Sequence, residues 1–71
     1  MNLLKLFQMM KKYKNSEEEI VKAVPFEWKK IPGFIVGYAD WHNDFTGPFG
    51  GCDEIEWMSK KDFIERYKFF E

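Results

Sequence analysis

Apolar residues along the chain are spaced first as in a helix and then as in strands. Leu3, Leu4, Phe7 and Met10 fall at positions i, i+1, i+4 and i+7, which places them on one side of a helix with lysines around it. This spacing predicts an amphipathic helix over residues 2–14. We expect it to pack on the core of the protein; a membrane surface or a partner's groove is the alternative for a basic amphipathic helix.

After that helix, the sequence predicts a short helical turn and then a strand. Ser16 and Glu19 have the spacing of a capping box, in which a hydroxyl and a carboxylate accept backbone N–H groups at the start of a helix. Pro25 disfavours helical backbone at Val24, and from Val24 onward apolar and polar residues alternate as in a half-buried strand. We therefore expect a second short helix at Ser16 and a first strand from Val24.

A hairpin is predicted next. Pro32 and Gly33 are the residue types of a type II turn, because Pro fixes φ at the first central position and Gly accepts the positive φ of the second. The run from Phe34 to Tyr38 is rich in β-branched and aromatic residues, which favours a strand. The predicted hairpin therefore turns at Pro32-Gly33 and continues as the most buried strand.

A third strand follows a glycine-rich segment. Ile55 and Trp57 alternate with Glu54 and Glu56, as in a strand with one face against a core and its carboxylates in water. The two carboxylates also resemble a general acid/base pair by their spacing. The alternation favours the simpler interpretation, in which they lie on the solvated face of a sheet.

The chain closes with a predicted helix. Ser59 is followed three residues later by Asp62, a second capping-box candidate. Phe63, Tyr67 and Phe70 then recur at helical spacing on one side. We expect this helix to bury that stripe against the sheet.

Together these elements predict a small α+β domain over residues 1–71, with an N-terminal helix, a three-stranded antiparallel sheet and a C-terminal helix packed on one sheet face. Because 71 residues enclose only a small core, such a chain often needs further support. Cys52 is the sole cysteine, so neither an intrachain disulfide nor a Cys/His zinc site is available. We therefore expect a homodimer. A free thiol without a secretory signal or membrane span favours the cytoplasm.

The segment over residues 39–52 is a glycine-rich loop that combines acids with aromatics. From Tyr38 to Trp57 the chain has five acidic residues and no Lys or Arg. Such a surface suits a basic protein partner and disfavours direct contact with nucleic-acid phosphates. The candidate partner-binding residues are Asp40, Trp41, Asp44, Phe45 and Phe49.

A second hypothesis uses the lysine pairs on either side of this loop. If the hairpin lies near the start of the last helix, the lysines converge on one anion site between two protomers, and a tryptophan stacks on a nucleotide base. The residues of this alternative small-ligand site are Trp28, Lys29, Lys30, Lys60 and Lys61. Ordinary solubilising lysines are the simpler interpretation.

Catalytic chemistry is the third and least favoured class. Asp40, His42 and Asp44 alternate and offer two carboxylates and one imidazole to a metal, but the chain has no other histidine to complete such a site. Cys52 is the available nucleophile, and the neighbouring Asp53 should raise the pKa of its thiol, which disfavours reactivity. We therefore expect no enzyme activity, no cofactor and no bound metal.

The stretch Glu56-Trp-Met-Ser-Lys-Lys-Asp-Phe-Ile-Glu-Arg-Tyr67 resembles the C-termini of many small proteins encoded by tailed bacteriophages. The compact chain, rich in Lys, Phe and Trp and poor in Cys, is similar to that group in composition. The resemblance covers about the last twenty residues. It implies an accessory protein made during infection that acts by binding, often by inhibiting a host enzyme or a defence factor in the host cytoplasm.

Overall fold

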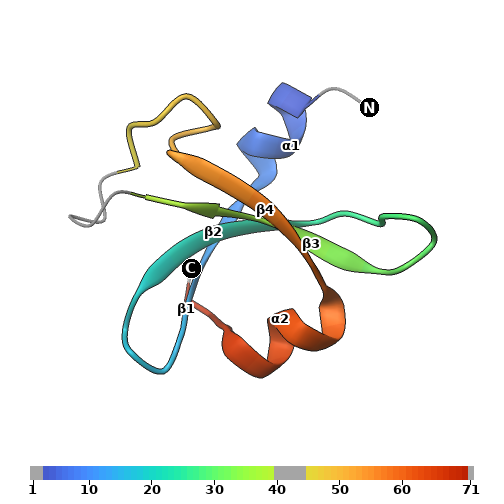
Figure 1. Ribbon diagram of the computed structural model, residues 1–71. Helices are drawn as coiled ribbons and strands as arrows, with labels where there is room; N and C mark the ends of the chain where they lie inside the picture. Colours follow the sequence, from blue (N-terminus) through green and yellow to red (C-terminus); the bar gives the residue numbers. More distant parts are fainter. Residues whose placement is uncertain (1–2, 40–44, 71) are drawn as a thin grey trace.

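The protein is built on one antiparallel sheet (Figure 1). The computed structural model describes residues 3–39 and 45–70, which form five strands in the order β4-β3-β2-β1-β5 and two short helices. The elements are α1 (Leu3–Met9), β1 (Lys11–Lys14), β2 (Ile20–Pro25), β3 (Gly33–Tyr38), β4 (Glu54–Ser59), α2 (Lys60–Arg66) and β5 (Lys68–Phe69). The first four strands form a meander. After α2 the chain returns to the sheet, where β5 pairs with the edge of β1 that β2 does not occupy.

The expected three-stranded sheet is wrong, because five strands are present in the described residues. The two missed strands, β1 and β5, pair with each other through Tyr13 and Phe69. Tyr13 also pairs with Val21 on β2, and its ring packs edge-on against Phe63. Tyr13 is thus fixed by residues far away in the sequence, which a local pattern does not reveal.

The N-terminal helix is shorter than predicted, since it ends at Met9 rather than at residue 14. The apolar spacing that favours a helix stops at Met10, and the next four residues join the sheet as β1. The second short helix at Ser16 is also absent. There the chain makes a tight turn in which the Asn15 side-chain oxygen accepts the N–H groups of Glu17 and Glu19 at 2.9 and 3.0 Å.

The β2–β3 hairpin turns at a different place from the predicted one. Trp28 and Ile31 exchange two backbone hydrogen bonds of 2.9 Å, so the central residues of the turn are Lys29 and Lys30. Both lysines have positive φ, 51° and 65°, as a two-residue type I′ turn requires. The expected Pro32-Gly33 corner is therefore wrong, and Gly33 begins β3 instead.

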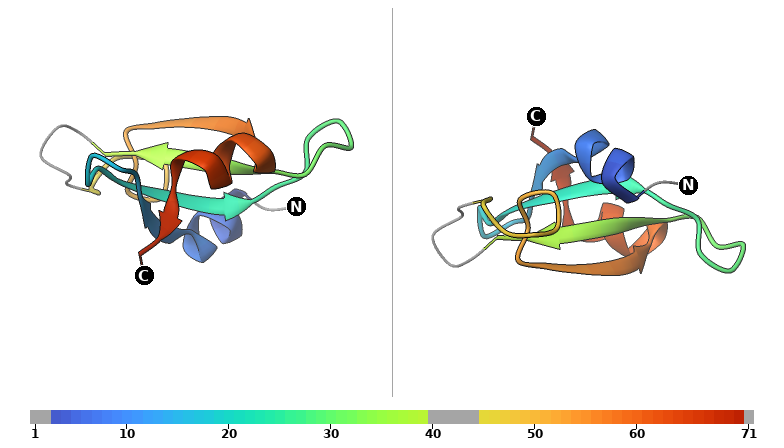
Figure 2. Two further views of the ribbon diagram at one scale, coloured as in Figure 1. Left: turned by 90° about the horizontal axis from the view of Figure 1, so that it is seen from below. Right: turned by 90° about the horizontal axis from the view of Figure 1, so that it is seen from above.

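Both faces of the sheet are covered by a helix (Figure 2). On one face, Val36 of β3 packs with Met58 and with Phe63 of α2. On the opposite face, Ile35 packs with Val24 and with Leu6 of α1. Thus α2 lies on one sheet face and α1 on the other.

The start of α2 follows the predicted capping pattern. The Ser59 hydroxyl accepts the N–H of Asp62 at 3.3 Å, and Phe63 is buried. The helix ends at Arg66, whereas the sequence predicts that it continues to Phe70. The segment after Tyr67 leaves the helix because β5 and Phe70 hydrogen-bond along β1.

Candidate functional site

Residues 45–52 of the acidic loop are anchored on the α1 face of the sheet. Cys52 is fully buried and lies directly on Gly37 of β3, where a Cβ atom would overlap its sulfur. Phe49 packs edge-on against Phe7 of α1, with ring centroids 6.5 Å apart. The Lys22 ammonium of β2 lies 5.0 Å from the centre of the Phe45 ring. Three contacts thus fix this half of the loop to the domain.

The loop backbone is also closed on itself. Gly47 and Gly51 exchange hydrogen bonds of 2.9 and 3.1 Å, and Phe49 and Cys52 exchange bonds of 3.0 and 3.1 Å. Gly51 has a φ of +98°, which a residue with a side chain rarely adopts. The glycines identified as a loop signal therefore form a compact double turn, and its end leads directly into β4.

The predicted partner-binding residues fall into two groups. Phe45 is half-buried against Lys22, and Phe49 is exposed beside Phe7 of α1. Asp40, Trp41 and Asp44 lie outside the described residues, as does the Asp40/His42/Asp44 metal hypothesis.

The environment of Cys52 disfavours the thiolate. Burial raises the pKa of the Cys52 thiol, and the Asp53 carboxylate raises it further, while the Lys22 ammonium opposes this. Asp53 thus acts in the predicted direction, although desolvation has the larger effect. Since the thiolate is the nucleophilic form, the buried Cys52 is a packing residue.

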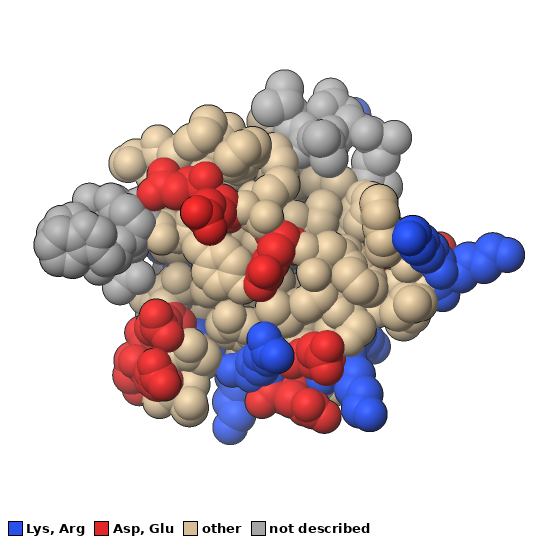
Figure 3. All heavy atoms as spheres, in the orientation of Figure 1, with Lys and Arg blue, Asp and Glu red and all other residues tan. Residues whose placement is uncertain are grey.

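Charge is divided between the two ends of the sheet. The β1–β2 turn and the start of β4 lie at one end of the meander, because antiparallel strands alternate in direction. This acidic end carries exposed Glu17, Glu18, Glu19, Asp53 and Glu54, and the Glu18 carboxylate is paired with the Lys14 ammonium at 2.8 Å. In Figure 3, acidic side chains gather on the left, at this end, and lysines project on the right, while acidic and basic side chains are mixed along the lower side of the molecule. The acidic end is therefore continuous with the loop that the sequence singles out.

The lysines at the other end belong to two neighbouring elements. The backbone N–H of Lys60 donates to the Pro32 carbonyl at 2.9 Å, which joins the start of α2 to the neck of the β2–β3 hairpin. Lys29 and Lys30 form the tip of that hairpin, and Trp28 beside them is 51% exposed. The structure thus places the residues of the alternative ligand site at one end of the fold. The tip projects into solvent and does not fold back over α2 (Figure 1).

Two features of the site are missed by sequence reasoning. The Tyr38 hydroxyl donates to the Glu56 carboxylate across β3 and β4, so Glu56 is held in place rather than free in water. Burial, the Glu56 carboxylate and the Tyr67 hydroxyl together raise the pKa of Tyr38. Lys22 also donates to the Gly50 carbonyl at 3.5 Å. The β3–β4 register could have indicated the first contact, but no local signal points to Lys22.

Comparisons of the chain with protein-family models, with curated proteins and with solved structures found no match. The fold therefore defines the class of protein by its architecture alone: a small five-stranded antiparallel sheet with a short helix on each face. Neither of the described helices has the length and apolar composition needed to cross a membrane.

Proposed function

We propose that this protein is a non-enzymatic binding protein that docks its acidic end, together with the aromatic loop over residues 39–52, on a basic surface of a partner protein. The observation that carries the proposal is the group of exposed acids at the end of the sheet where the loop leads into β4 (Figure 3). Such a surface attracts a basic partner over several ångströms and orients it before contact.

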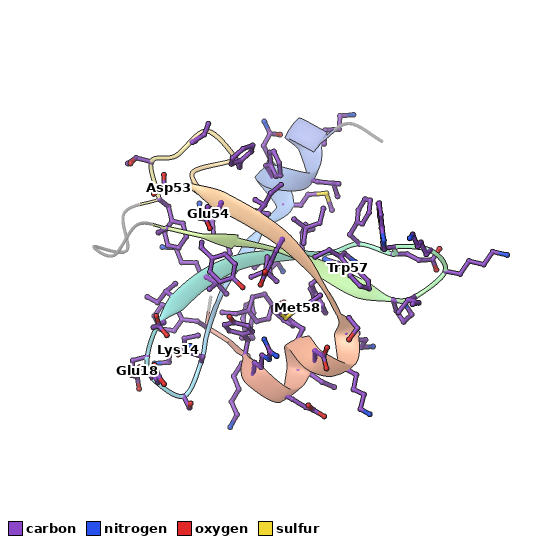
Figure 4. All side chains as sticks on the ribbon, in the orientation of Figure 1. Lys14, Glu18, Asp53, Glu54, Trp57 and Met58 are labelled. Carbon is purple, nitrogen blue, oxygen red and sulfur yellow. The ribbon has the colours of Figure 1, made fainter. Side chains whose placement is uncertain are left out.

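The way the loop is mounted supports this proposal. Lys22, Gly37 and Phe7 fix residues 45–52 on the sheet, which lowers the entropy lost when the loop binds. Asp53 and Glu54 lie where this loop leads into β4 (Figure 4). The backbone N–H of Asp53 donates to the Tyr38 carbonyl at 2.8 Å. This hydrogen bond fixes the backbone from which the Asp53 carboxylate extends.

The chemistry of the described residues also favours binding over catalysis. The thiol of Cys52 is buried and its pKa is raised, which disfavours the thiolate needed for nucleophilic attack. The resemblance to small bacteriophage proteins fits an inhibitor or modulator of a host enzyme or defence factor. The host cytoplasm, a reducing compartment, is compatible with the free thiol, and a homodimer would add support to the small core.

Trp41→Ala is the substitution that tests this proposal at one residue. A tryptophan that acts as an interface hot spot contributes about 2 kcal/mol or more of binding free energy. We expect Trp41→Ala to weaken binding to the captured partner by that amount, mainly through faster dissociation. Asp40→Asn and Asp44→Asn should mainly slow association, and the slowing should vanish at high salt. Unchanged binding kinetics in all three variants would refute the proposal.

The second candidate is a nucleotide-binding protein. The hydrogen bond from Lys60 to Pro32 favours it, because it brings both lysine pairs to one end of the fold. A thermal-shift screen against nucleotides tests this directly, since a ligand at 100 times its dissociation constant stabilises the folded state by about 2.7 kcal/mol. No shift with any nucleotide would remove this candidate, whereas a shift lost in Lys29→Ala and Lys60→Ala would support it.

A further inference from the structure

Within residues 3–39 and 45–70, no strand pairs with the outer edge of the six-residue strand β4. β4 is the last strand of the sheet on its side, and none of the described residues forms a strand beyond it. The Lys60 N–H bonds to the Pro32 carbonyl, so the alternation of an antiparallel pair directs the backbone of Glu54, Glu56 and Met58 toward β3. The N–H and C=O groups of Ile55 and Trp57 therefore point away from the sheet.

The side chains along this edge differ between the two faces. Glu54 and Glu56 lie on the α2 face, and the Tyr38 hydroxyl holds the Glu56 carboxylate. Ile55 lies on the α1 face and is 37% exposed, next to Trp57, which is partly buried. Figure 4 shows Glu54 and Trp57 toward opposite ends of the strand. A strand added here meets carboxylates on one face and apolar side chains on the other.

We propose that β4 binds an extended segment of the partner as a sixth strand, one in which basic residues alternate with apolar residues. The period of two along a strand places the basic side chains opposite Glu54 and Glu56 and the apolar ones opposite Ile55 and Trp57. Backbone hydrogen bonds to Ile55 and Trp57 supply affinity, and the carboxylates supply specificity. The inference rests on the proposed function, because it names how the same basic partner is recognised.

A second copy of this chain is a poorer occupant of the edge. In an antiparallel pairing centred on Ile55, Glu54 faces Glu56 of the other copy, and in one centred on Glu56 that residue faces itself. Like charges directly opposite each other disfavour strand pairing. The carboxylates thus select against self-association through β4 and in favour of a cationic strand.

The probe for this inference is the capped hexapeptide Val-Arg-Val-Arg-Val-Arg, with Val-Val-Val-Arg-Arg-Arg as a control of the same composition. We expect the alternating peptide to bind and to slow hydrogen exchange at the Ile55 and Trp57 amides by at least tenfold. The control should bind at least tenfold more weakly. Binding without protection of these amides, equal binding of both peptides, or no binding at millimolar peptide would overturn the inference.

Ile55→Pro isolates the contribution of the backbone. Proline removes the outward N–H and leaves the hydrogen bonds to β3 intact, since those belong to Glu54, Glu56 and Met58. Ile55→Ala is the matched control, because it removes most of the side chain and keeps the N–H. We expect Ile55→Pro to bind the alternating peptide at least tenfold more weakly than Ile55→Ala, with the native fold of both checked by circular dichroism.

The same pair of variants separates this inference from the proposed function. If Ile55→Pro and Ile55→Ala bind the captured basic partner equally well, strand addition is wrong and the acidic-end proposal stands. If the wild-type protein captures no basic partner, the proposed function is wrong whatever the peptides do.

Discussion

At the scale of single residues, Trp57 shows how one side chain joins the hairpin to the sheet. Its indole Nε1 donates to the Phe26 carbonyl at 2.8 Å, and its ring covers Gly33, where a Cβ atom would overlap it. We expect Trp57→Phe to lower the free energy of unfolding by about 1 kcal/mol, because it leaves the Phe26 carbonyl without this donor. Urea denaturation measures the change.

Trp28→Phe is the matched control for that substitution. Trp28 is half exposed at the hairpin tip, so its replacement should change the unfolding free energy by less than about 0.5 kcal/mol. Equal losses in the two variants would contradict the role assigned to the Trp57 indole.

Cys52 gives the protein a pH dependence of known sign. Folding raises the pKa of its thiol, so the folded protein holds this proton more tightly than the unfolded chain. The resulting stabilisation is complete below the unfolded pKa of about 8.5 and is lost as the pH rises toward the folded value. We therefore expect the unfolding free energy to fall as the pH rises above about 8.5, and to fall less in Cys52→Ala. Identical slopes for both proteins would contradict this.

At the scale of elements, the β2–β3 hairpin carries backbone strain. Lys29 and Lys30 both adopt positive φ, which is unfavourable for residues with side chains. Asn-Gly is the preferred pair for this turn. We expect the double variant Lys29→Asn/Lys30→Gly to raise the unfolding free energy by about 1–2 kcal/mol in urea denaturation.

The double variant Lys29→Ala/Lys30→Ala separates strain from charge at that hairpin. It removes the same two charges and keeps a Cβ atom at both positions, so it should not stabilise the protein. A gain as large as that of the Asn-Gly variant would show that charge repulsion, and not backbone strain, is relieved.

The elements also show what sequence reasoning can and cannot predict. The strand from Phe34 to Tyr38, the strand containing Ile55 and Trp57, and the Ser59 cap follow from local patterns, and the structure contains all three. β1 and β5 are short strands that exist only because they pair with each other and with β2. The Lys29-Lys30 turn carries no glycine or asparagine, so the Pro32-Gly33 pair, a stronger local signal, misplaces the corner.

In the candidate site, too, local patterns predict some features and long-range contacts determine the others. The glycines and the acidic run correctly indicate a loop before β4, and the expected effect of Asp53 on the pKa of the Cys52 thiol is correct in direction. The contacts that hold the loop, from Lys22 to Phe45 and from Phe7 to Phe49, join residues more than twenty positions apart. Such contacts depend on the register of the whole sheet, which the sequence pattern alone does not fix.

At the scale of the whole molecule, the meander gives a nearly neutral chain an uneven distribution of charge over its surface. The net charge is −1, yet the strand directions bring the acids of two separate connections to one end and the Lys29 and Lys60 pairs to the other. This division makes the sign of the expected partner testable, because exposed charges at the two ends can be changed independently.

The most direct test of this account is affinity capture from nuclease-treated lysate with two variants that each lose three carboxylates. One variant loses Glu54 of the acidic end and two acids of the loop over residues 39–52, as Asp40→Asn, Asp44→Asn and Glu54→Gln. The other loses three acids from different parts of the chain, as Glu27→Gln, Asp62→Asn and Glu65→Gln. We predict that the wild type and the second variant capture the same basic protein in stoichiometric amount, released by high salt, and that the first variant does not. Equal capture by both variants, or no basic partner with the wild type, would contradict the account.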